Sequence, residues 1–312
     1  MIGIGLAIMI ASQTLTLLHV EPFWSWNTPI AWTGFILFAD GVVWRARSDS
    51  WIRSAPRELV LLALVSIPLW LVFEGFNLVI DNWQYSGLPE NFWLRQVGYA
   101  WSFATIWPAI FEAAELVGVL RTGRATNARQ AGRAGRAGQG GGTPLSPLPA
   151  RPVRPASPAL SLSVLVGAAM LVAPFIVTRA TARYLAAPLW LGFIFLLDPI
   201  NLRLGGESLW ADWRVGRRDR TIDLMLSGML CGILWEFWNY WARARWHYTL
   251  PVLERWKVFE MPVPGYFGFP PFALECFTMY VFVRLVLVYV TAGFLRTLGP
   301  AETGRRIGSV AR

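Results

Sequence analysis

The sequence predicts an all-α integral membrane protein with about eight transmembrane helices, arranged as a tandem 4+4 duplication. Three observations lead to this prediction. Of the 312 residues, 55% are hydrophobic and only 15% are charged, which lies outside the usual range of soluble proteins. The apolar residues fall into runs of about 20, the length that crosses a hydrocarbon core about 30 Å thick. The two halves of the chain also share a spaced set of polar and aromatic residues.

The apolar runs form two groups of four, one on each side of a polar segment. The first run opens at the first residue, with no basic segment before it and no clear small-residue cleavage site. We therefore expect a helix there rather than a removed signal peptide. The predicted helices span 1–19, 29–45, 58–80, 97–120, 159–178, 184–202, 222–242 and 266–295.

The segment between the two groups, residues 121–158, consists mainly of Gly, Pro, Ala and Arg. Such a segment has almost nothing to bury, so it is expected to be a disordered tether. The predicted domains are therefore a first four-helix unit at 1–120, the linker at 121–158, and a second four-helix unit at 159–312.

Charge predicts the orientation of the chain, because Lys and Arg collect in cytoplasmic loops. With these boundaries, 20 of the 28 basic residues fall on the side that holds both termini and the linker. The sequence therefore predicts cytoplasmic termini and a multi-pass protein of the bacterial inner membrane. This bias and attraction to membrane lipids account for the net charge of +9, so no nucleic-acid partner is expected.

An internal repeat is indicated by three pairs of stretches. One of them, GYAWSFATIWPAIFE with GYFGFPPFALE, needs a four-residue gap and pairs Glu112 with Glu275. The stretch PIAWTGFILFADG at 29–41 aligns with PLWLGFIFLLDP at 188–199, with the same distance from Trp to Asp in both. The stretch FEGFNLVIDNWQYSGLP aligns with WEFWNYWARARWHYTLP, so that Glu74 corresponds to Glu236 and Asn77 to Asn239. Because each unit has an even number of helices, both copies would run in the same direction, related by a pseudo-two-fold axis along the membrane normal.

Acidic residues inside the predicted helices are the candidate functional groups. A charged side chain at bilayer depth costs at least about 2.5–3.5 kcal/mol, so each of these acids needs a partner or a function. Desolvation among aromatic rings favours a protonated carboxyl group, which makes such a group a candidate general acid. The six that are paired across the repeat are Asp40, Glu74, Glu112, Asp198, Glu236 and Glu275.

Helical spacing places an amide beside two of these acids. Glu74 and Asn77, like Glu236 and Asn239, are three residues apart and so share a helix face. The predicted roles are proton donor for Glu74 or Glu236, and orientation of the acid for the two asparagines. The remaining acids are assigned as the second carboxylate of each half, Glu112 and Glu275, and as substrate contacts, Asp40 and Asp198. Hydrogen bonding that only fixes helix packing is the competing interpretation for each of them.

Ten of the 18 tryptophans are sorted by their position in the predicted helices. Those at loop edges are expected to form an interfacial belt; they are Trp24, Trp26, Trp83, Trp93, Trp246 and Trp256. Those deeper in the helices could line a cavity and stabilise a cation with their ring faces, although core packing is the alternative; they are Trp70, Trp235, Trp238 and Trp241.

Metal and disulfide chemistry is not expected. The two cysteines, Cys231 and Cys276, both lie inside predicted helices, so no disulfide framework or zinc pattern can be built. The two histidines, His19 and His247, lie in different loops and form no ligand pair with metal spacing. No cofactor is therefore predicted.

The order of these motifs resembles the integral-membrane lycopene cyclases of the heterodimeric or fused type. Trp235-Glu236 followed by Trp246-x-Tyr248 matches the acidic helix and the aromatic pair of that family. The string WEFWNY also resembles fungal membrane-bound terpene cyclases. The chain departs from the lycopene cyclase pattern where a Pro-x-Glu-Glu motif would stand, since Val-Pro-Gly comes after FEMP at that place. Four helices per unit are also one more than that family has.

Both resemblances imply protonation of an isoprenoid by a buried carboxylic acid, ring closure through a carbocation, and loss of a proton to a second base. The expected function is therefore acid-initiated cyclisation, or a related isomerisation or hydration, of a long isoprenoid or carotenoid such as lycopene that enters from the lipid. Two alternatives stay open. The paired acids could form the proton relay of a proton-coupled transporter, or the protein could be a membrane scaffold without chemistry.

The two repeated glutamates differ in the charged residue that comes after each of them on the same helix face. Seven residues on, about 10 Å along a helix, Glu74 has Asp81 whereas Glu236 has Arg243. An anion nearby favours the protonated acid and a cation favours the carboxylate. The sequence thus predicts Glu74 as the protonated acid and Glu236 as the ionised group, unless Asp81 and Arg243 only anchor their helix ends in water.

Overall fold

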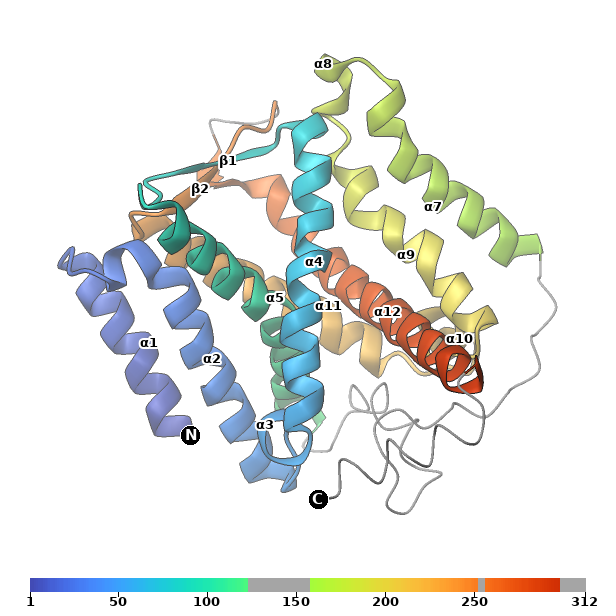
Figure 1. Ribbon diagram of the computed structural model, residues 1–312, viewed down its shortest axis with the longest axis horizontal. Helices are drawn as coiled ribbons and strands as arrows, with labels where there is room; N and C mark the ends of the chain where they lie inside the picture. Colours follow the sequence, from blue (N-terminus) through green and yellow to red (C-terminus); the bar gives the residue numbers. More distant parts are fainter. Residues whose placement is uncertain (123–157, 252–255, 298–312) are drawn as a thin grey trace.

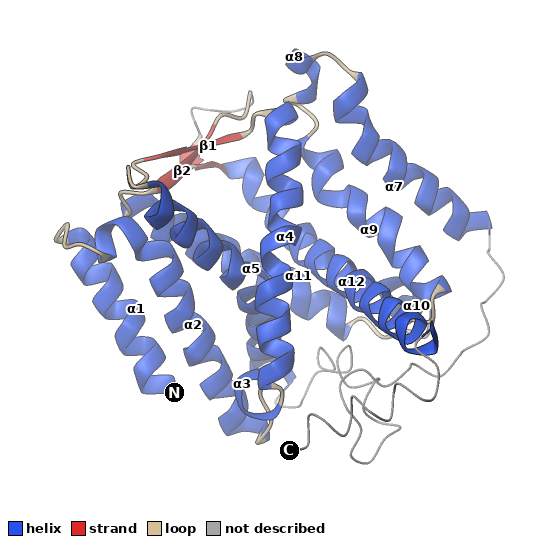
Figure 2. Ribbon diagram, viewed as in Figure 1, coloured by secondary structure: helices blue, strands red, loops and turns tan. Residues whose placement is uncertain are grey.

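The computed structural model describes residues 1–122, 158–251 and 256–297, and the chain is mostly helical with little sheet (Figure 2). Each predicted apolar run coincides with a long helix. These helices are α1 (Ile2–Leu17), α2 (Phe23–Arg47), α4 (Pro56–Ile80), α5 (Phe92–Thr122), α7 (Pro158–Ile176), α9 (Ala186–Arg203), α11 (Asp219–Trp241) and α12 (Phe269–Thr297). Residues 123–157 of the predicted linker lie outside the described part of the chain.

Short elements connect the long helices at both ends of the molecule (Figure 1). The short helices are α3 (Trp51–Ser54), α8 (Arg179–Ala182), α10 (Leu209–Arg214) and the 3-10 helix η2 (Val263–Gly268). The strands are β1 (Trp83–Ser86), β2 (Arg245–Tyr248), β3 (Lys257–Val258) and β4 (Met261–Pro262). In Figure 1, α3 and α10 lie toward one end and the strands toward the other.

Five helices of the described chain are long and apolar enough to cross a membrane: α4, α5, α7, α11 and η2 continuing into α12. Helix α1 has only 16 residues, about 24 Å, which is less than the hydrocarbon thickness. The outward faces of α4 and α7 are apolar, with Leu64, Leu78 and Leu165 among their exposed side chains. Large apolar side chains facing outward are compatible with a surface covered by lipid.

Small residues bring the first two helices of each half into close contact. A Cβ atom on Gly5 of α1 would meet the backbone of Gly34 in α2, and a Cβ atom on Gly167 of α7 would meet the backbone of Gly192 in α9. Glycine at such positions lets two helix backbones approach closely, which is the usual way apolar helices pack in lipid. The two helix pairs therefore use the same device, with Gly34 and Gly192 at corresponding sequence positions.

Two buried aspartates, in α2 and α9, accept hydrogen bonds from the first turn of the short helix that comes next in the chain. Asp40 accepts a hydrogen bond from the backbone N–H of Ile52 at the start of α3, at 2.8 Å. Asp198 accepts bonds from the Ser208 hydroxyl at 2.8 Å, from Leu209 N–H at 2.7 Å and from Trp210 N–H at 3.0 Å, all at the start of α10. A carboxylate on the free N–H groups of a first helical turn is a stabilising cap.

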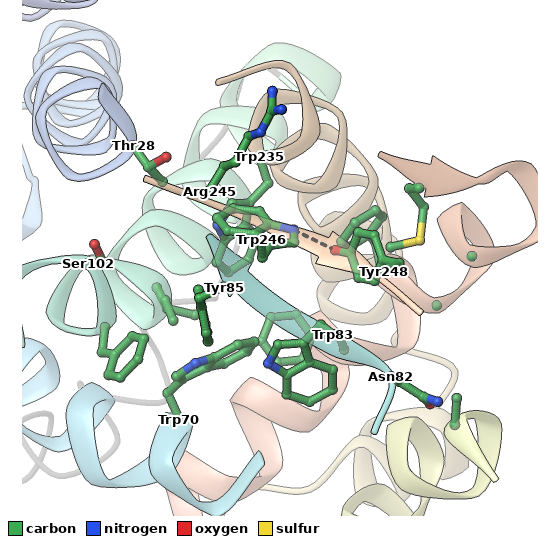
Figure 3. A pocket seen from close by; sticks show the side chains of 18 of the residues that line it. Thr28, Trp70, Asn82, Trp83, Tyr85, Ser102, Trp235, Arg245, Trp246 and Tyr248 are labelled. Atoms are coloured by element: carbon green, nitrogen blue, oxygen red, sulfur yellow. Dashed lines mark hydrogen bonds between the residues drawn. The ribbon is translucent and has the colours of Figure 1, made fainter. Parts of the chain in front are cut away.

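The two halves meet through α5 and α11, which pack against each other, and through the antiparallel pair β1–β2. In this pair Trp83 lies opposite Tyr248 and Tyr85 opposite Trp246. Successive residues of a strand point to opposite faces, so these four rings lie on one face of the pair. That face is turned toward the interior between the two halves (Figure 3).

Candidate functional site

A cavity of about 480 Å³ lies between the two halves, under the inner face of β1 and β2 (Figure 3). Its volume is within the range of ordinary ligand sites, about 300–1,000 Å³. The aromatic residues in its wall come from both halves: Trp26, Trp70, Trp83, Tyr85, Tyr99, Phe103, Tyr184, Trp190, Trp235, Trp246, Tyr248, Phe267, Phe269 and Phe272. Its charged lining residues in the described chain are Arg95 and Arg245, and Figure 3 shows the side chain of Arg245 pointing away from the rings.

Glu74 lies directly behind this wall, in α4. One carboxylate oxygen, Oε1, accepts hydrogen bonds from Tyr85 Oη at 2.5 Å, Trp70 Nε1 at 2.8 Å and Trp83 Nε1 at 3.2 Å. All three donors line the cavity, whereas Glu74 itself is not among the described lining residues. The carboxylate is therefore separated from the cavity by the side chains of the wall. Tyr85, which lines the cavity, connects the two through its hydroxyl group.

Glu236 occupies the corresponding place in α11, and it is fully buried. Its Oε1 accepts a hydrogen bond from Tyr248 Oη at 2.9 Å, and Trp246 Nε1 donates to the same Tyr248 hydroxyl at 3.0 Å. Tyr248 and Trp246 line the cavity and Glu236 does not. A second Glu–Tyr pair thus stands behind the cavity wall.

The two asparagines hold the strands that carry these tyrosines. Asn77 donates from Nδ2 to the carbonyl of Trp83 at 2.8 Å and accepts from its N–H at 3.2 Å. Asn239 donates to the carbonyl of Trp246 at 2.9 Å and accepts from its N–H, also at 2.9 Å. The predicted orienting role therefore takes an indirect form, because each amide positions the strand whose tyrosine contacts the acid.

Both tyrosines stay neutral over the ordinary pH range. Burial and the neighbouring carboxylates, Glu74 and Glu236, raise the pKa of Tyr85 and of Tyr248 well above the usual value of a phenol. A neutral hydroxyl can donate one hydrogen bond and accept another at the same time. Each tyrosine is therefore suited to pass a proton between a carboxyl group and a molecule in the cavity.

The rings of the wall contact one another across the two halves. Trp70 of α4 lies 6.1 Å from Trp235 of α11, measured between ring centroids, and 6.2 Å from Trp83. Trp235 also packs edge-on against Trp246, at 6.3 Å. Aromatic faces within about 6 Å of a cation attract it, by about 2 kcal/mol or more when the cation is desolvated.

Several residues that the sequence assigned to the site lie elsewhere. Glu112 and Glu275 are fully buried in α5 and α12, outside the cavity wall, and Glu275 accepts a bond from the backbone N–H of Phe193 at 3.2 Å. Asp40 and Asp198 cap α3 and α10, so their carboxylates are used by backbone N–H groups rather than by a substrate.

Two tryptophans assigned to substrate binding also lie outside the wall. Trp238 is buried against Trp32 of α2, with ring centroids 4.8 Å apart, and Trp241 is 40% exposed at the end of α11. Their depth in the predicted helix does not place them in the cavity wall. Trp70 and Trp235 do line it.

Two aromatic residues of the cavity wall were assigned to another role in the sequence analysis. Trp83 and Trp246 were assigned to the membrane interface because they come after helix ends, yet both line the cavity. The signal that could have found them is the Trp-x-Tyr spacing, which in a strand turns both rings to one face.

Asp81 and Arg243 form their contacts with residues other than the two glutamates. The carboxylate of Asp81 accepts from Gln84 Nε2 at 3.3 Å, and Arg243 pairs with Glu21 at 3.2 Å on the surface. They anchor the ends of α4 and α11. Asp81 and Arg243 therefore give no reason to expect a protonated Glu74 and an ionised Glu236. The protonation states of the two glutamates have to be argued from their burial and their hydrogen bonds instead.

Comparison of the chain with protein-family models, with curated proteins and with solved structures finds no match in any of the three.

Proposed function

We propose that this protein is an integral membrane enzyme that carries out acid-initiated cyclisation, or a related isomerisation or hydration, of a long isoprenoid or carotenoid such as lycopene. The observation that carries the proposal is the aromatic cavity with a Glu–Tyr pair behind its wall in each half, Glu74–Tyr85 and Glu236–Tyr248. Cyclisation of an alkene needs an acid, a base and a surface that tolerates a carbocation. The two pairs and the rings supply these three functions without a cofactor.

The acid step is assigned to the second half. A protonated Glu236 donates to the oxygen of Tyr248 while the Tyr248 hydroxyl proton moves to a double bond of the substrate. The substrate gains one C–H bond and becomes a tertiary carbocation, and Glu236 becomes a carboxylate. Full burial of Glu236 supports this assignment, because burial disfavours the charged form.

The base step is assigned to the first half. After a C–C bond has closed the ring, a proton leaves the carbocation for the oxygen of Tyr85, whose own proton moves to Glu74. Three N–H and O–H donors on Glu74 Oε1 support this role, because they stabilise the ionised form that must receive the proton. One proton has then moved from Glu236 to Glu74, and its return resets the site.

The two halves are proposed to be tandem four-helix units of an eight-helix transmembrane protein. Support comes from contacts that recur at the corresponding positions: the Asn77 and Asn239 amides on the strands, the Asp40 and Asp198 caps, and the glycine contacts of α1–α2 and α7–α9. The β1–β2 register supports a two-fold relation, because it pairs each Trp with the Tyr of the other half.

Both termini are proposed to be cytoplasmic, in a bacterial inner membrane. Arg45, Arg47 and Arg53 lie around α3, and Arg214 and Arg217 lie at or after the end of α10, toward the same end in Figure 1. Lys and Arg are enriched on the cytoplasmic side. A topology reporter fused after residue 140 is expected to be active in the cytoplasm; activity on the other side would refute this orientation.

The reaction is tested in bacteria that accumulate lycopene, by chromatography of their pigments with and without the protein. Cyclic products that disappear with Glu236→Gln would support the proposal. Unchanged lycopene removes that substrate, and the purified protein is then tested with other long isoprenoids. Proton-coupled uptake into vesicles, without any change in the isoprenoid, would favour a transporter instead.

A further inference from the structure

The outer face of the β1–β2 pair carries a second cluster of reactive side chains. Ser86 Oγ lies 2.6 Å from Nε2 of His247, and the other ring nitrogen, Nδ1, lies 3.2 Å from a carboxylate oxygen of Glu260. The residues come from β1, β2 and the turn between β3 and β4. A hydroxyl, an imidazole and a carboxylate are thus connected in a line.

The reactive side chains of this cluster are turned away from the cavity, although the backbone of Glu260 lies within hydrogen-bond reach of Glu236 behind the wall. Ser86 alternates with Tyr85, and His247 with Trp246 and Tyr248, so the cluster faces away from the aromatic wall. None of its three residues is among the described residues of the cavity wall. Ser86 is exposed and the His247 side chain is 34% exposed, so a molecule outside the protein can reach the hydroxyl.

The direction of the hydrogen bonds can be deduced from the chemistry of the three groups. An ionised carboxylate can only accept, so His247 must carry its proton on Nδ1 to bond with Glu260. In the neutral ring Nε2 then has no proton and accepts from the Ser86 hydroxyl. This tautomer is the one that a base needs in order to take the proton of a nucleophilic serine.

The turn that presents Glu260 is held in an unfavourable backbone conformation. Phe259, the residue before Glu260, has φ of 56°, a left-handed value that bulky residues rarely adopt. Its ring packs on Phe237 at 5.8 Å and on Tyr240 at 5.6 Å, both in α11. Such conformations persist only where the surroundings fix them, so α11 fixes the position of the Glu260 carboxylate beside His247.

We propose that Ser86, His247 and Glu260 form a nucleophilic centre that hydrolyses acyl esters. Ser86 Oγ attacks the ester carbonyl carbon while its proton moves to His247 Nε2. The resulting intermediate collapses, the C–O bond to the alcohol breaks, and the alcohol takes the proton from Nε2. Water then attacks the acyl-serine by the same steps and releases a carboxylic acid. Glu260 holds the imidazole in its tautomer and stabilises the imidazolium.

The surroundings indicate an ester with an apolar acyl chain. Val258 is 49% exposed and Trp256 is 72% exposed, and both belong to the segment that leads into the Glu260 turn. Exposed apolar side chains beside a reactive group suit an acyl chain better than a polar ester. Arg245 lies on the same outer face, directly opposite Ser86 in the register. Its cationic side chain would attract an ester that carries a negative group.

The test uses the full chain in lipid nanodiscs with a fluorophosphonate probe, which modifies serines activated by histidine. Mass spectrometry of the wild-type protein is expected to find the probe on Ser86. His247→Asn should slow labelling on the order of 10³-fold, and Glu260→Gln at least about 10²-fold. Ser86→Ala should remove the label, whereas Ser48→Ala, which changes an exposed serine near α3, should leave it unchanged.

Hydrolysis of p-nitrophenyl esters of increasing chain length gives a second readout, and longer apolar chains should react faster. The variants are compared only if their size-exclusion profiles match the wild type. A wild-type protein that carries no probe on Ser86 would overturn the proposal, whatever the variants do. So would labelling of Ser86 at an equal rate in His247→Asn. Neither result bears on the cavity.

Discussion

The regions around Glu74 and Glu236 are built from the same parts. In both, an asparagine three residues after the glutamate binds the backbone of a tryptophan at the start of a strand, and a tyrosine two residues later donates to the glutamate. Because the two strands pair with each other, both tyrosines reach one cavity. The shared parts place one carboxyl group behind the cavity wall in each half.

The difference between the two regions lies in one helical turn. Four residues before Glu74 stands Trp70, whose indole donates to the carboxylate at 2.8 Å. Four residues before Glu236 stands Gly232, where any Cβ atom would clash with the ring of Phe269. At this position the first region has an indole donor to the carboxylate, and the second has an apolar ring. The two acids therefore differ in their surroundings on this helix face.

The largest expected effect comes from replacing the two glutamates, which tests whether they have different roles. Glu236→Gln should lower turnover about 10⁴-fold, because an amide has no acidic proton to give. Glu74→Gln should lower it about 10²-fold, because Tyr85 can still pass a proton to water. Product formation by purified variants in nanodiscs measures both. If Glu74→Gln keeps full activity, only one half carries the chemistry and the comparison fails.

The helix caps give the next largest difference, in stability. Asp198→Ala should destabilise the protein by about 4 kcal/mol, since three donors at the start of α10 lose their acceptor. Asp40→Ala should destabilise the protein by about 1–2 kcal/mol, since one donor loses its acceptor. Thermal unfolding in detergent compares the two. Asp219→Ala, at a side chain 64% exposed, is the control and should change little.

Removal of the tyrosine hydroxyls tests whether both glutamates act on the cavity through a tyrosine. Tyr248→Phe and Tyr85→Phe should each lower turnover about 10²-fold, because each interrupts the path between a carboxyl group and the cavity. Binding of the substrate should change little, since the rings remain. Tyr289→Phe, at an exposed tyrosine of α12, serves as control. Equal loss of binding in both variants would mean that the hydroxyls contact the substrate instead.

The smallest expected effect is a pH dependence in the second half. Burial raises the pKa of Glu207 to about 7, although Arg220 lies 3.3 Å away. The folded state then holds this proton more tightly than the unfolded state, so stability is highest at low pH and falls between about pH 4.5 and 7. Chemical unfolding at several pH values should lose this contribution in Glu207→Gln but not in Glu90→Gln, at an exposed residue. A slope that persists in Glu207→Gln would assign it to another group.

Much of the fold could be predicted because long apolar runs determine helices almost by themselves. The predicted run 222–242 and helix α11 (Asp219–Trp241) differ by three residues at one end and one at the other. Helix α1 was predicted as a span from composition, but its length is set by where its backbone turns at Leu18, which periodicity does not reveal. Strands β1 and β2 were not predicted, because four residues are too few for an alternating pattern to stand out.

The site was predicted in part for a similar reason. Glu74 and Glu236 stood out because charge is rare at membrane depth. The residues that touch the cavity, such as Tyr85 and Tyr248, did not, since aromatic residues after a helix end are ordinary at an interface. In the sequence Asp40 and Asp198 resembled the other acids of the predicted helices, and only the position of the next short helix identifies them as caps.

The register of β1 and β2 has a consequence for the origin of the cavity. Two copies of β1 alone, paired antiparallel about a two-fold axis, would set Trp83 of one copy opposite Tyr85 of the other, as Trp83 now faces Tyr248. The same rings would then enclose a space between two identical chains. In geometric terms the cavity resembles a two-fold dimer interface contained in a single polypeptide, in which the two sides can differ in sequence.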